Sequence, residues 1–195
     1  MLKLTRRAFL PAIAAAAFAF AAPAMAQDAD NTMIITLKGG DVTVKLRPDL
    51  APKHVEQIKT LARRGDYDNV VFHRVIDGFM AQTGDVEFGD AENGYNPDRA
   101  GTGGSDLPDI PAEFSDTPYV RGVVGMARAQ DPNSANSQFF IMFTEYPSLN
   151  GAYTVIGEVT DGMDLVDAIK KGDAGANGLV ENPDRMIKVR IAGDG

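Results

Sequence analysis

Three short runs of this chain bring together an arginine, two glutamines and several large apolar side chains. The runs are residues 72–82 (FHRVIDGFMAQ), 125–128 (GMAR) and 137–141 (SQFFI). A guanidinium group offers several hydrogen-bond donors, and side-chain amides both donate and accept. Together with apolar side chains, these groups suit a site that holds a proline ring and donates a hydrogen bond to its imide nitrogen. Such a site needs no nucleophile, metal or general base.

The alternation of side chains along a strand predicts how the first run is arranged. If residues 70–75 form a regular strand, Phe72 and Arg74 share one face and His73 points the opposite way. Burying an arginine is costly, so Arg74 taken alone would more often be a surface side chain or half of an ion pair. The two neighbouring runs are what favour a functional Arg74.

The third run alternates in the same way. Gln138 and Phe140 face one side of the predicted strand, and Phe139 and Ile141 face the other. We therefore expect Phe139 and Ile141 in the core, with Gln138 and Phe140 lining a site. Each phenylalanine taken singly is more often an ordinary core residue, so this assignment depends on the three runs occurring together.

Other residues that could carry chemistry are predicted to be structural. Neither His54 nor His73 is expected to lie on the face of Arg74, and the sequence contains no cysteine, so a Cys/His metal cluster and a disulfide are both excluded. Residues 101–104 (GTGG) are not followed by the Lys-Ser/Thr pair of a phosphate-binding loop, which favours a turn. We expect neither a metal nor a cofactor.

In this order, the three runs resemble the cyclophilin family of peptidyl-prolyl cis/trans isomerases, and the resemblance extends over about residues 32–191. It implies that Arg74 and Gln82 are catalytic and that proline-containing polypeptides are the substrates. It also implies these substrate-binding residues: Phe79, Met80, Ala127, Arg128, Gln138, Phe140, Leu149 and Tyr153. In a straight strand, Phe79 would point away from the face that Met80 and Gln82 share. Its place in the site therefore depends on the resemblance.

The implied activity is cis/trans isomerisation of X-Pro bonds in exported proteins, with Ala127 and the backbone of Arg128 binding the residues before the proline. The alternative is a proline-binding chaperone or interaction module that uses the same groove without catalysis. An intact Arg74 disfavours this alternative, because binding alone does not require a donor at the imide nitrogen. A β-barrel carrier for a small apolar ligand is a more distant possibility.

The chain departs from the common family pattern at four places. Ser148 stands where many eukaryotic members have a tryptophan, which leaves cyclosporin binding open, and Tyr153 replaces a histidine in one wall of the pocket. Asn136 replaces a glycine, which would be tolerated in a left-handed backbone conformation. Residues 85–100 form a longer connection than usual, which either shapes the choice of partner or is an inert surface insertion.

Period-two patterns and turn residues predict many strands and two helices. The expected strands are residues 32–37, 42–46, 70–75, 79–83, 120–128, 138–143, 154–159 and 186–191. One expected helix covers residues 52–64, with Pro52 in its first turn and Gly65 directly after its end. A second, short helix is expected around residues 163–169. This pattern by itself supports a mainly β domain. The resemblance implies a closed eight-stranded antiparallel β-barrel capped by two α-helices.

The first residues read as a cleavable export signal. Arg6 and Arg7 precede an uncharged alanine-rich stretch that ends in Ala24-Met25-Ala26, which predicts cleavage after Ala26. The surrounding residues 5–10 (TRRAFL) favour the twin-arginine export route over the general secretory route. We therefore expect residues 1–26 to be a signal, residues 27–195 to be the isomerase domain, and the periplasm to be its location.

The charge of the chain limits its partners. The signal holds three of the 19 basic residues and none of the 27 acidic ones, which leaves residues 27–195 with 16 basic residues and a net charge of −11. Such an acidic domain disfavours binding to nucleic acid or to anionic membranes. We expect a monomer that has no contact with the membrane after the signal is cleaved.

Overall fold

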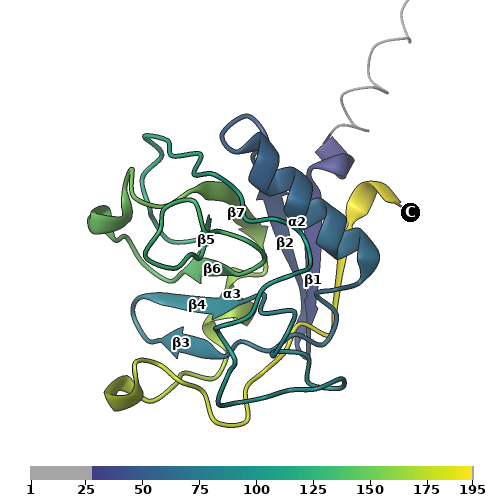
Figure 1. The fold of residues 1–195 in the computed structure, drawn as a ribbon, viewed down its shortest axis with the longest axis vertical. Coiled ribbons are helices and arrows are strands. Elements are labelled where there is room, and N and C mark those ends of the chain that lie inside the picture. Colours follow the sequence, from purple (N-terminus) through teal and green to yellow (C-terminus); the bar gives the residue numbers. More distant parts are fainter. Residues whose placement is uncertain (1–27, 195) are drawn as a thin grey trace, which may run out of the picture.

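The computed structural model describes residues 28–194, which form a mainly β domain around one eight-stranded antiparallel sheet (Figure 1). The strands are β1 (Thr32–Leu37), β2 (Gly40–Leu46), β3 (Arg74–Ile76), β4 (Met80–Thr83), β5 (Val123–Met126), β6 (Phe139–Met142), β7 (Val155–Asp161) and β8 (Lys188–Ile191). Their order across the sheet is β3-β4-β6-β5-β7-β2-β1-β8. The helices are α2 (Pro52–Arg64), α3 (Met163–Asp167), η1 (Pro147–Leu149), η2 (Ala174–Ala176) and η3 (Ala192–Asp194).

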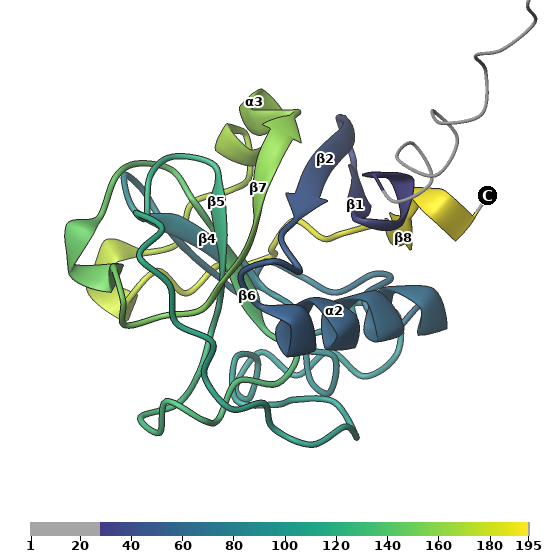
Figure 2. The same ribbon diagram turned by 90° about the horizontal axis from the view of Figure 1, so that it is seen from above.

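The two predicted helices are confirmed. Helix α2 has a proline in its first turn and ends at Gly65, whose left-handed backbone (φ 77°) suits a residue without a side chain. Its buried stripe includes Val55, Ile58 and Leu61, which pack into the main core. Helix α3 is short and buries Val166. Figure 2 shows α2 on one side of the curled sheet and α3 on the other, near β2 and β7.

The prediction of a fully closed barrel is wrong, because the sheet is a curled half-barrel whose edge strands β3 and β8 are not neighbours. The segment that follows η2 lies between them. Val75 N donates to Gly178 O (2.8 Å) and Val180 N donates to His73 O (3.1 Å), which are contacts of isolated bridges and not of a ladder. Left-handed residues at Asn177, Gly178 and Asn182 interrupt this segment, so it cannot form a regular closing strand.

The expectation for residues 70–75 also needs correction. Only Arg74–Ile76 is a strand (β3), and Val70 and Val71 make isolated bridges to Asp90 and Arg185. Because the backbone before β3 is irregular, simple alternation fails there. Phe72 is buried in the main core, whereas Arg74 is only partly buried and lies at the sheet surface. The two side chains therefore do not share the face that the sequence predicts.

The two ends of the described chain meet beside α2. Asp30 forms ion pairs with Lys59 and with Arg63 (2.6 Å), and Arg63 Nε also contacts Asp194 (3.0 Å). A Cβ atom on Gly193 would lie 3.0 Å from the backbone nitrogen of Asp30, so the two segments are in close contact. Figures 1 and 2 show these ends on the opposite side of the molecule from β3, η1 and η2.

The predicted signal, residues 1–26, lies outside the described residues, so its cleavage and export route stay predictions. Within residues 28–194, no helix has the length and apolar character needed to cross a membrane.

Candidate active site

Arg74 is held on two sides by uncharged groups. The β3–β4 register places it directly opposite Gln82, and its Nη1 donates to Gln82 Oε1 (3.2 Å). On the other side, Nε donates to the carbonyl oxygen of Asn177 and Nη2 donates to its Oδ1, both at 3.0 Å. Partial burial lowers the pKa of Arg74, but a guanidinium remains charged in proteins. The result is a fixed cation at the sheet surface.

Hydrogen bonds continue from Arg74 through the two glutamines. Gln82 Nε2 donates to Gln138 Oε1 (3.0 Å), and Gln138 Nε2 donates to the carbonyl oxygen of Gly103 (2.8 Å). This sequence of contacts joins β3, β4, the start of β6 and a loop, and it fixes the direction in which each amide points. The amide oxygen of Gln82 is thereby turned toward Arg74.

A buried carboxylate, Asp85, holds the loop that supplies Gly103. Its Oδ1 accepts from the backbone nitrogens of Glu87 (3.1 Å) and Phe88 (2.9 Å), and its Oδ2 accepts from those of Gly101 (2.7 Å) and Gly103 (3.0 Å). One side chain therefore ties both ends of the long connection together. The far end of this connection is part of the site, because Gly103 is the acceptor for Gln138.

The predicted site residues gather around a pocket of about 200 Å³. It is lined by Arg74, Phe79, Met80, Gln82, Ala127, Arg128, Phe140, Leu149 and Tyr153, which is the whole predicted set except Gln138. Gln138 lines an adjoining pocket of about 350 Å³, together with Gly103 and Ser134. Gln82, Ala127 and Arg128 line both pockets, so the two form neighbouring parts of one groove.

Aromatic contacts shape the apolar wall of the smaller pocket. Phe79 precedes β4 and follows Gly78, whose backbone is left-handed (φ 66°), so the bend turns its ring into the pocket despite its parity. Its ring centroid lies 4.5 Å from that of Tyr146. Phe140 is buried, and its ring centroid lies 5.8 Å from that of Tyr119 and 5.9 Å from that of Tyr153. Phe139 and Ile141 lie in the main core, as their alternation predicts.

The side chain of Arg128 is part of the site as well as its backbone. The guanidinium carbon lies 4.4 Å from the centre of the Tyr153 ring, within the range of a cation–π contact. Its nitrogens donate to the carbonyl oxygens of Ala129 (2.9 Å), Gln130 (3.3 Å) and Ala152 (3.1 Å). These contacts place a second fixed cation in the groove.

Neither histidine lines the pocket, as expected. His54 Nδ1 lies 2.7 Å from Glu113 Oε2 at the start of α2. His73 is buried against Gly101, where an added Cβ would lie 2.9 Å from the ring. Burial lowers the pKa of His73 to about 4. The ring is therefore neutral near pH 7 and has a packing role.

Three groups that hold the candidate site residues in place were not found from the sequence: Asn177, the Gly103 carbonyl and Asp85. Asn177 has a left-handed backbone (φ 54°) directly before Gly178, and an Asn-Gly pair is a turn signal that could have marked a rigid loop. Asn136, however, does not have the left-handed backbone considered for it. Its Oδ1 instead accepts from the backbone nitrogen of Ser105 (2.7 Å).

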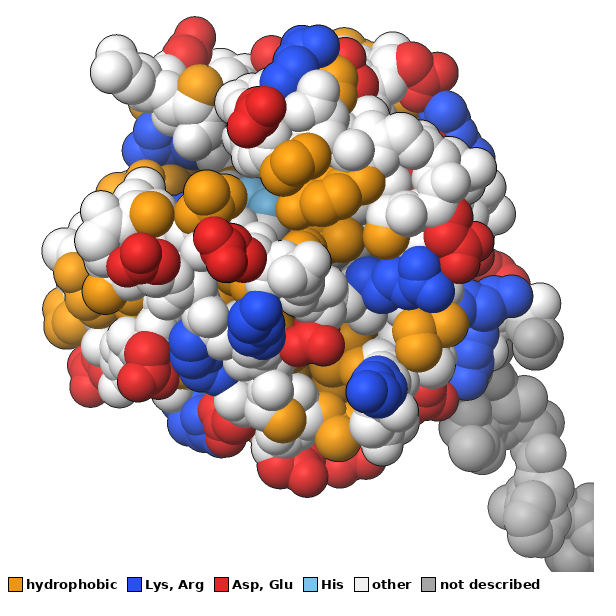
Figure 3. Space-filling view, turned by 90° about the horizontal axis from the view of Figure 1, so that it is seen from below, with side chains coloured by type: hydrophobic (Ala, Val, Ile, Leu, Met, Phe, Trp, Pro, Cys, Tyr) orange, Lys and Arg blue, Asp and Glu red, His pale blue; other side chains and the backbone are white. Residues whose placement is uncertain are grey.

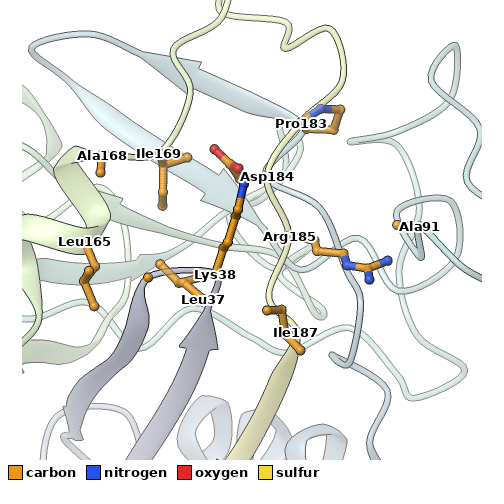
Figure 4. Close-up of a pocket in the computed structure, with 11 residues that line it drawn as sticks. Leu37, Lys38, Ala91, Leu165, Ala168, Ile169, Pro183, Asp184, Arg185 and Ile187 are labelled. Atoms are coloured by element: carbon orange, nitrogen blue, oxygen red, sulfur yellow. The ribbon is translucent and has the colours of Figure 1, made fainter.

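A larger groove of about 750 Å³ lies elsewhere and contains none of the predicted residues. Figure 4 shows Leu37 and Lys38 of the β1–β2 hairpin on one side, facing Leu165 and Ile169 of the α3 region, with residues 183–187 across from them. Its arginine, Arg185, pairs with Glu92 (3.1 Å). Size alone therefore does not identify the site.

Comparisons with known proteins agree with this geometry. Residues 32–191 match the family described as "Cyclophilin type peptidyl-prolyl cis-trans isomerase/CLD". A probable peptidyl-prolyl cis-trans isomerase of Brucella suis is 61% identical over 188 residues, covering 94% of this chain and 96% of that protein. Peptidyl-prolyl cis-trans isomerase B of Escherichia coli is 36% identical over 148 residues, covering 72% of this chain and 84% of that protein.

Solved structures are similar as well. Cyclophilin AquaCyp293 from Hirschia baltica has a TM-score of 0.71 at 28% identity, covering 86% of this chain and 76% of that one. A Cryptosporidium parvum cyclophilin type isomerase, crystallised in the presence of the dipeptide Ala-Pro, has a TM-score of 0.69 at 27% identity, covering 82% of this chain and 98% of that one.

The architecture is a curled antiparallel sheet with a largely apolar pocket that also contains two arginines. The chain belongs to the cyclophilin-type peptidyl-prolyl cis-trans isomerases. It is accordingly an enzyme that acts on prolyl peptide bonds, and the Brucella suis and Escherichia coli relatives carry the same activity in their names.

Proposed function

We propose that this isomerase acts on X-Pro bonds of exported polypeptides in the periplasm, and that Arg74 is its catalytic group. The single observation that carries the assignment of Arg74 is its position. A charged guanidinium lines the apolar pocket and is oriented from both sides by Asn177 and Gln82, without a carboxylate among its hydrogen-bond partners in residues 28–194.

The chemistry requires a donor that acts on the twisted peptide bond. Rotation is slow because the nitrogen lone pair is delocalised into the carbonyl, which gives a barrier of roughly 18–20 kcal/mol. In the twisted transition state the lone pair localises on the proline nitrogen and can accept a hydrogen bond from Arg74. Since this contact exists only in the transition state, it lowers the barrier in addition to binding the substrate.

The remaining residues have positioning and binding roles in this proposal. Phe79, Met80, Phe140 and Leu149 hold the proline ring, and Tyr153 closes one wall of the pocket. Ala127 and the backbone of Arg128 bind the residues before the proline. Gln82 orients Arg74, and Gln82 and Gln138 bind the substrate backbone. No step in this scheme needs a metal or a cofactor.

Features of the sequence support the exported context. The basic head, alanine-rich stretch and Ala24-Met25-Ala26 end of the signal support export, and Arg6-Arg7 supports the twin-arginine route. The net charge of −11 for residues 27–195 supports a role away from nucleic acid and from anionic lipid. On the face shown in Figure 3, basic side chains are interleaved with acidic ones. We infer a monomer that leaves the membrane after cleavage.

Catalysis is tested by exchange NMR with a proline peptide that has no ionisable side chains. We expect the wild type to accelerate the cis/trans exchange. An Arg74→Lys variant should bind the peptide but turn it over poorly, because one ammonium group cannot reproduce the planar fork of a guanidinium. If the wild type binds the peptide without accelerating exchange, the protein is instead a proline-binding module.

The export route is tested separately by changing Arg6 and Arg7 together to Lys. This variant keeps the charge of the signal but removes the guanidinium pair. We expect uncleaved precursor in the cytoplasm, measured by fractionation and immunoblotting. A normal yield of processed protein in the periplasm would show that the general secretory route is sufficient.

A further inference from the structure

The arginines of this protein differ in whether a carboxylate neutralises them. Arg47, Arg63, Arg64, Arg121, Arg185 and Arg190 form ion pairs with acidic side chains. Arg74 and Arg128, the two that line the proline pocket, have no such pair among the residues described, and neither does Arg99, which lies over the Phe88 ring outside the pocket. The chain has 27 acidic residues against 19 basic ones, so acidic partners are plentiful elsewhere on it.

The charge of Arg128 has a fixed position. Its guanidinium lies over the Tyr153 ring at 4.4 Å and donates to three carbonyl oxygens at 2.9 to 3.3 Å. Carbonyl and aromatic partners hold the group in place but do not cancel its charge. A cation that is already ordered loses less conformational entropy when it binds a ligand than a mobile surface side chain does.

Arg128 also has a donor to spare. A guanidinium carries five N–H groups, and the three carbonyl contacts use three of them. In the part of the chain that the structure describes, both N–H groups of Nη1 are used and only one of Nη2, so one N–H of Nη2 remains, whereas the unpartnered Nε is buried. The group can therefore interact with an anion without giving up the contacts that hold it.

The location of Arg128 determines what it meets. It lines both the proline pocket and the adjoining pocket, and no Asp or Glu is among the described residues that line either one. When the proline of a substrate fills the proline pocket, the residues before it enter the adjoining pocket of about 350 Å³ and pass this guanidinium. Resting on the function proposed above, we infer that Arg128 determines specificity: it selects substrates with an acidic side chain at one of the two positions before the proline.

The expected selectivity is moderate because the groove is open to water. Ion pairs between partly exposed groups are weakened by solvent, side-chain entropy and salt, so we expect a preference of about three- to tenfold for Glu over Gln. Glu and Gln have nearly the same shape, so this ratio reports on charge alone. The ratio should decrease as salt is raised.

The experiment compares two pairs of short peptides, one with Glu or Gln directly before the proline and one with Glu or Gln one position earlier. For each peptide we measure kcat/KM by exchange NMR and Kd by titration. In the wild type the Glu peptide of at least one pair should be preferred by about three- to tenfold, in Kd as well as in kcat/KM. In Arg128→Gln the ratio should fall to about one, and in Arg128→Lys part of it should remain.

The ratio provides its own control, because general loosening of the groove would weaken both peptides of a pair equally. Arg190→Gln on β8, whose arginine pairs with Asp41, should keep the wild-type ratio. A ratio near one in the wild type for both pairs, or an unchanged ratio in Arg128→Gln, would overturn the inference even if the Gln peptides are isomerised normally. If no peptide is isomerised, the proposed function fails, and the Kd ratios still decide the role of Arg128.

Discussion

The proline pocket and the larger groove beside α3 differ in how their arginines are held. The groove is more than three times larger, at about 750 against 200 Å³, but its Arg185 is paired with Glu92 and its Asp184 accepts from the backbone nitrogen of Lys170. The pocket instead contains Arg74, whose hydrogen-bond partners are amides and a carbonyl. The smaller pocket is therefore the one whose arginine has no carboxylate partner among the described residues.

This difference shows that orienting a cation and neutralising it are separate tasks. A carboxylate partner does both, because it accepts hydrogen bonds and carries a full negative charge. Asn177 and Gln82 accept hydrogen bonds from Arg74 without adding a negative charge, so in the proposed mechanism the full positive charge stays available to the developing lone pair. Charge placed in advance at the position where it is needed in the transition state is a large source of catalysis.

The largest expected effect is the loss of the pocket arginine. Arg74→Ala should lower kcat/KM by about one to three orders of magnitude with an unchanged fold, because it removes the transition-state donor. Arg185→Ala, the matched change in the groove, should leave kcat/KM as it is. Exchange NMR and circular dichroism measure both. Native-like Arg74→Ala with full activity would contradict the assignment.

Asn177→Asp separates orientation from neutralisation. The aspartate retains an acceptor for Arg74 but adds a negative charge, so we expect kcat to fall by about three- to tenfold while the arginine stays in place, a cost of about 1 kcal/mol. The Nε–H signal of Arg74 in the NMR spectrum shows whether the side chain remains ordered. If an ordered Arg74 in this variant gives wild-type kcat, neutral partners are not what matters.

A smaller effect is expected from the loop. Asp85→Asn leaves only one carbonyl oxygen where two carboxylate oxygens accept four backbone N–H groups, so the Gly103 carbonyl becomes less fixed. We expect kcat/KM to fall about two- to fivefold, with faster amide exchange at Gly103. Asp90→Asn on the same loop is the control, since Asp90 caps only residues 92 and 93. Equal activity of both variants would show that the loop end does not position the site.

The smallest effect on activity is expected from His73, which precedes Arg74 in the sequence, is buried and does not line the pocket. Since no histidine is among the described residues that line the pocket, kcat/KM should be flat between pH 6 and 9, and His73→Gln should retain most of it. A bell-shaped profile that disappears in His73→Gln would assign a catalytic role to this histidine.

Stability should depend on His73 even though activity does not. Burial lowers its pKa from 6.5 to about 4 in the folded protein, so the unfolded chain binds the proton more tightly. The contribution of neutral His73 to the free energy of unfolding is complete above pH 6.5. It is lost as the pH falls toward 4, by about 1.4 kcal/mol per pH unit. Urea unfolding of wild type and His73→Gln at pH 5 and 7 measures this slope. Equal slopes would show that His73 is not buried as a neutral ring.

Site residues whose positions follow from nearby residues could be predicted from the sequence. Those brought to the site by long loops could not. Arg74 and Gln82 face each other because a tight turn joins β3 and β4, and such a register follows from nearby residues. Asn177 contacts Arg74 from 103 positions away, through a turn with left-handed residues. No periodic pattern in the sequence encodes that approach, because it depends on the path of a long irregular loop.

The two errors about the fold have the same cause. The segment before β3 was expected to be a regular strand, and the sheet was expected to close. Both depend on how residues 178–187 run between β3 and β8, where isolated bridges replace a ladder. Hydrophobic alternation predicts that a strand exists, but it does not predict whether its edge finds a continuous partner.

The meeting of the two ends of the described chain beside α2 has a practical consequence for protein engineering. Because Asp30 and Asp194 converge on Arg63, a short linker could join the ends to make a circular permutant. A fusion partner or a solid support attached next to residue 28 or residue 194 would sit away from η1 and η2 (Figures 1 and 2), and η1 contributes Leu149 to the proline pocket. The enzyme could then be immobilised, or joined in tandem, with its groove open to a passing unfolded chain.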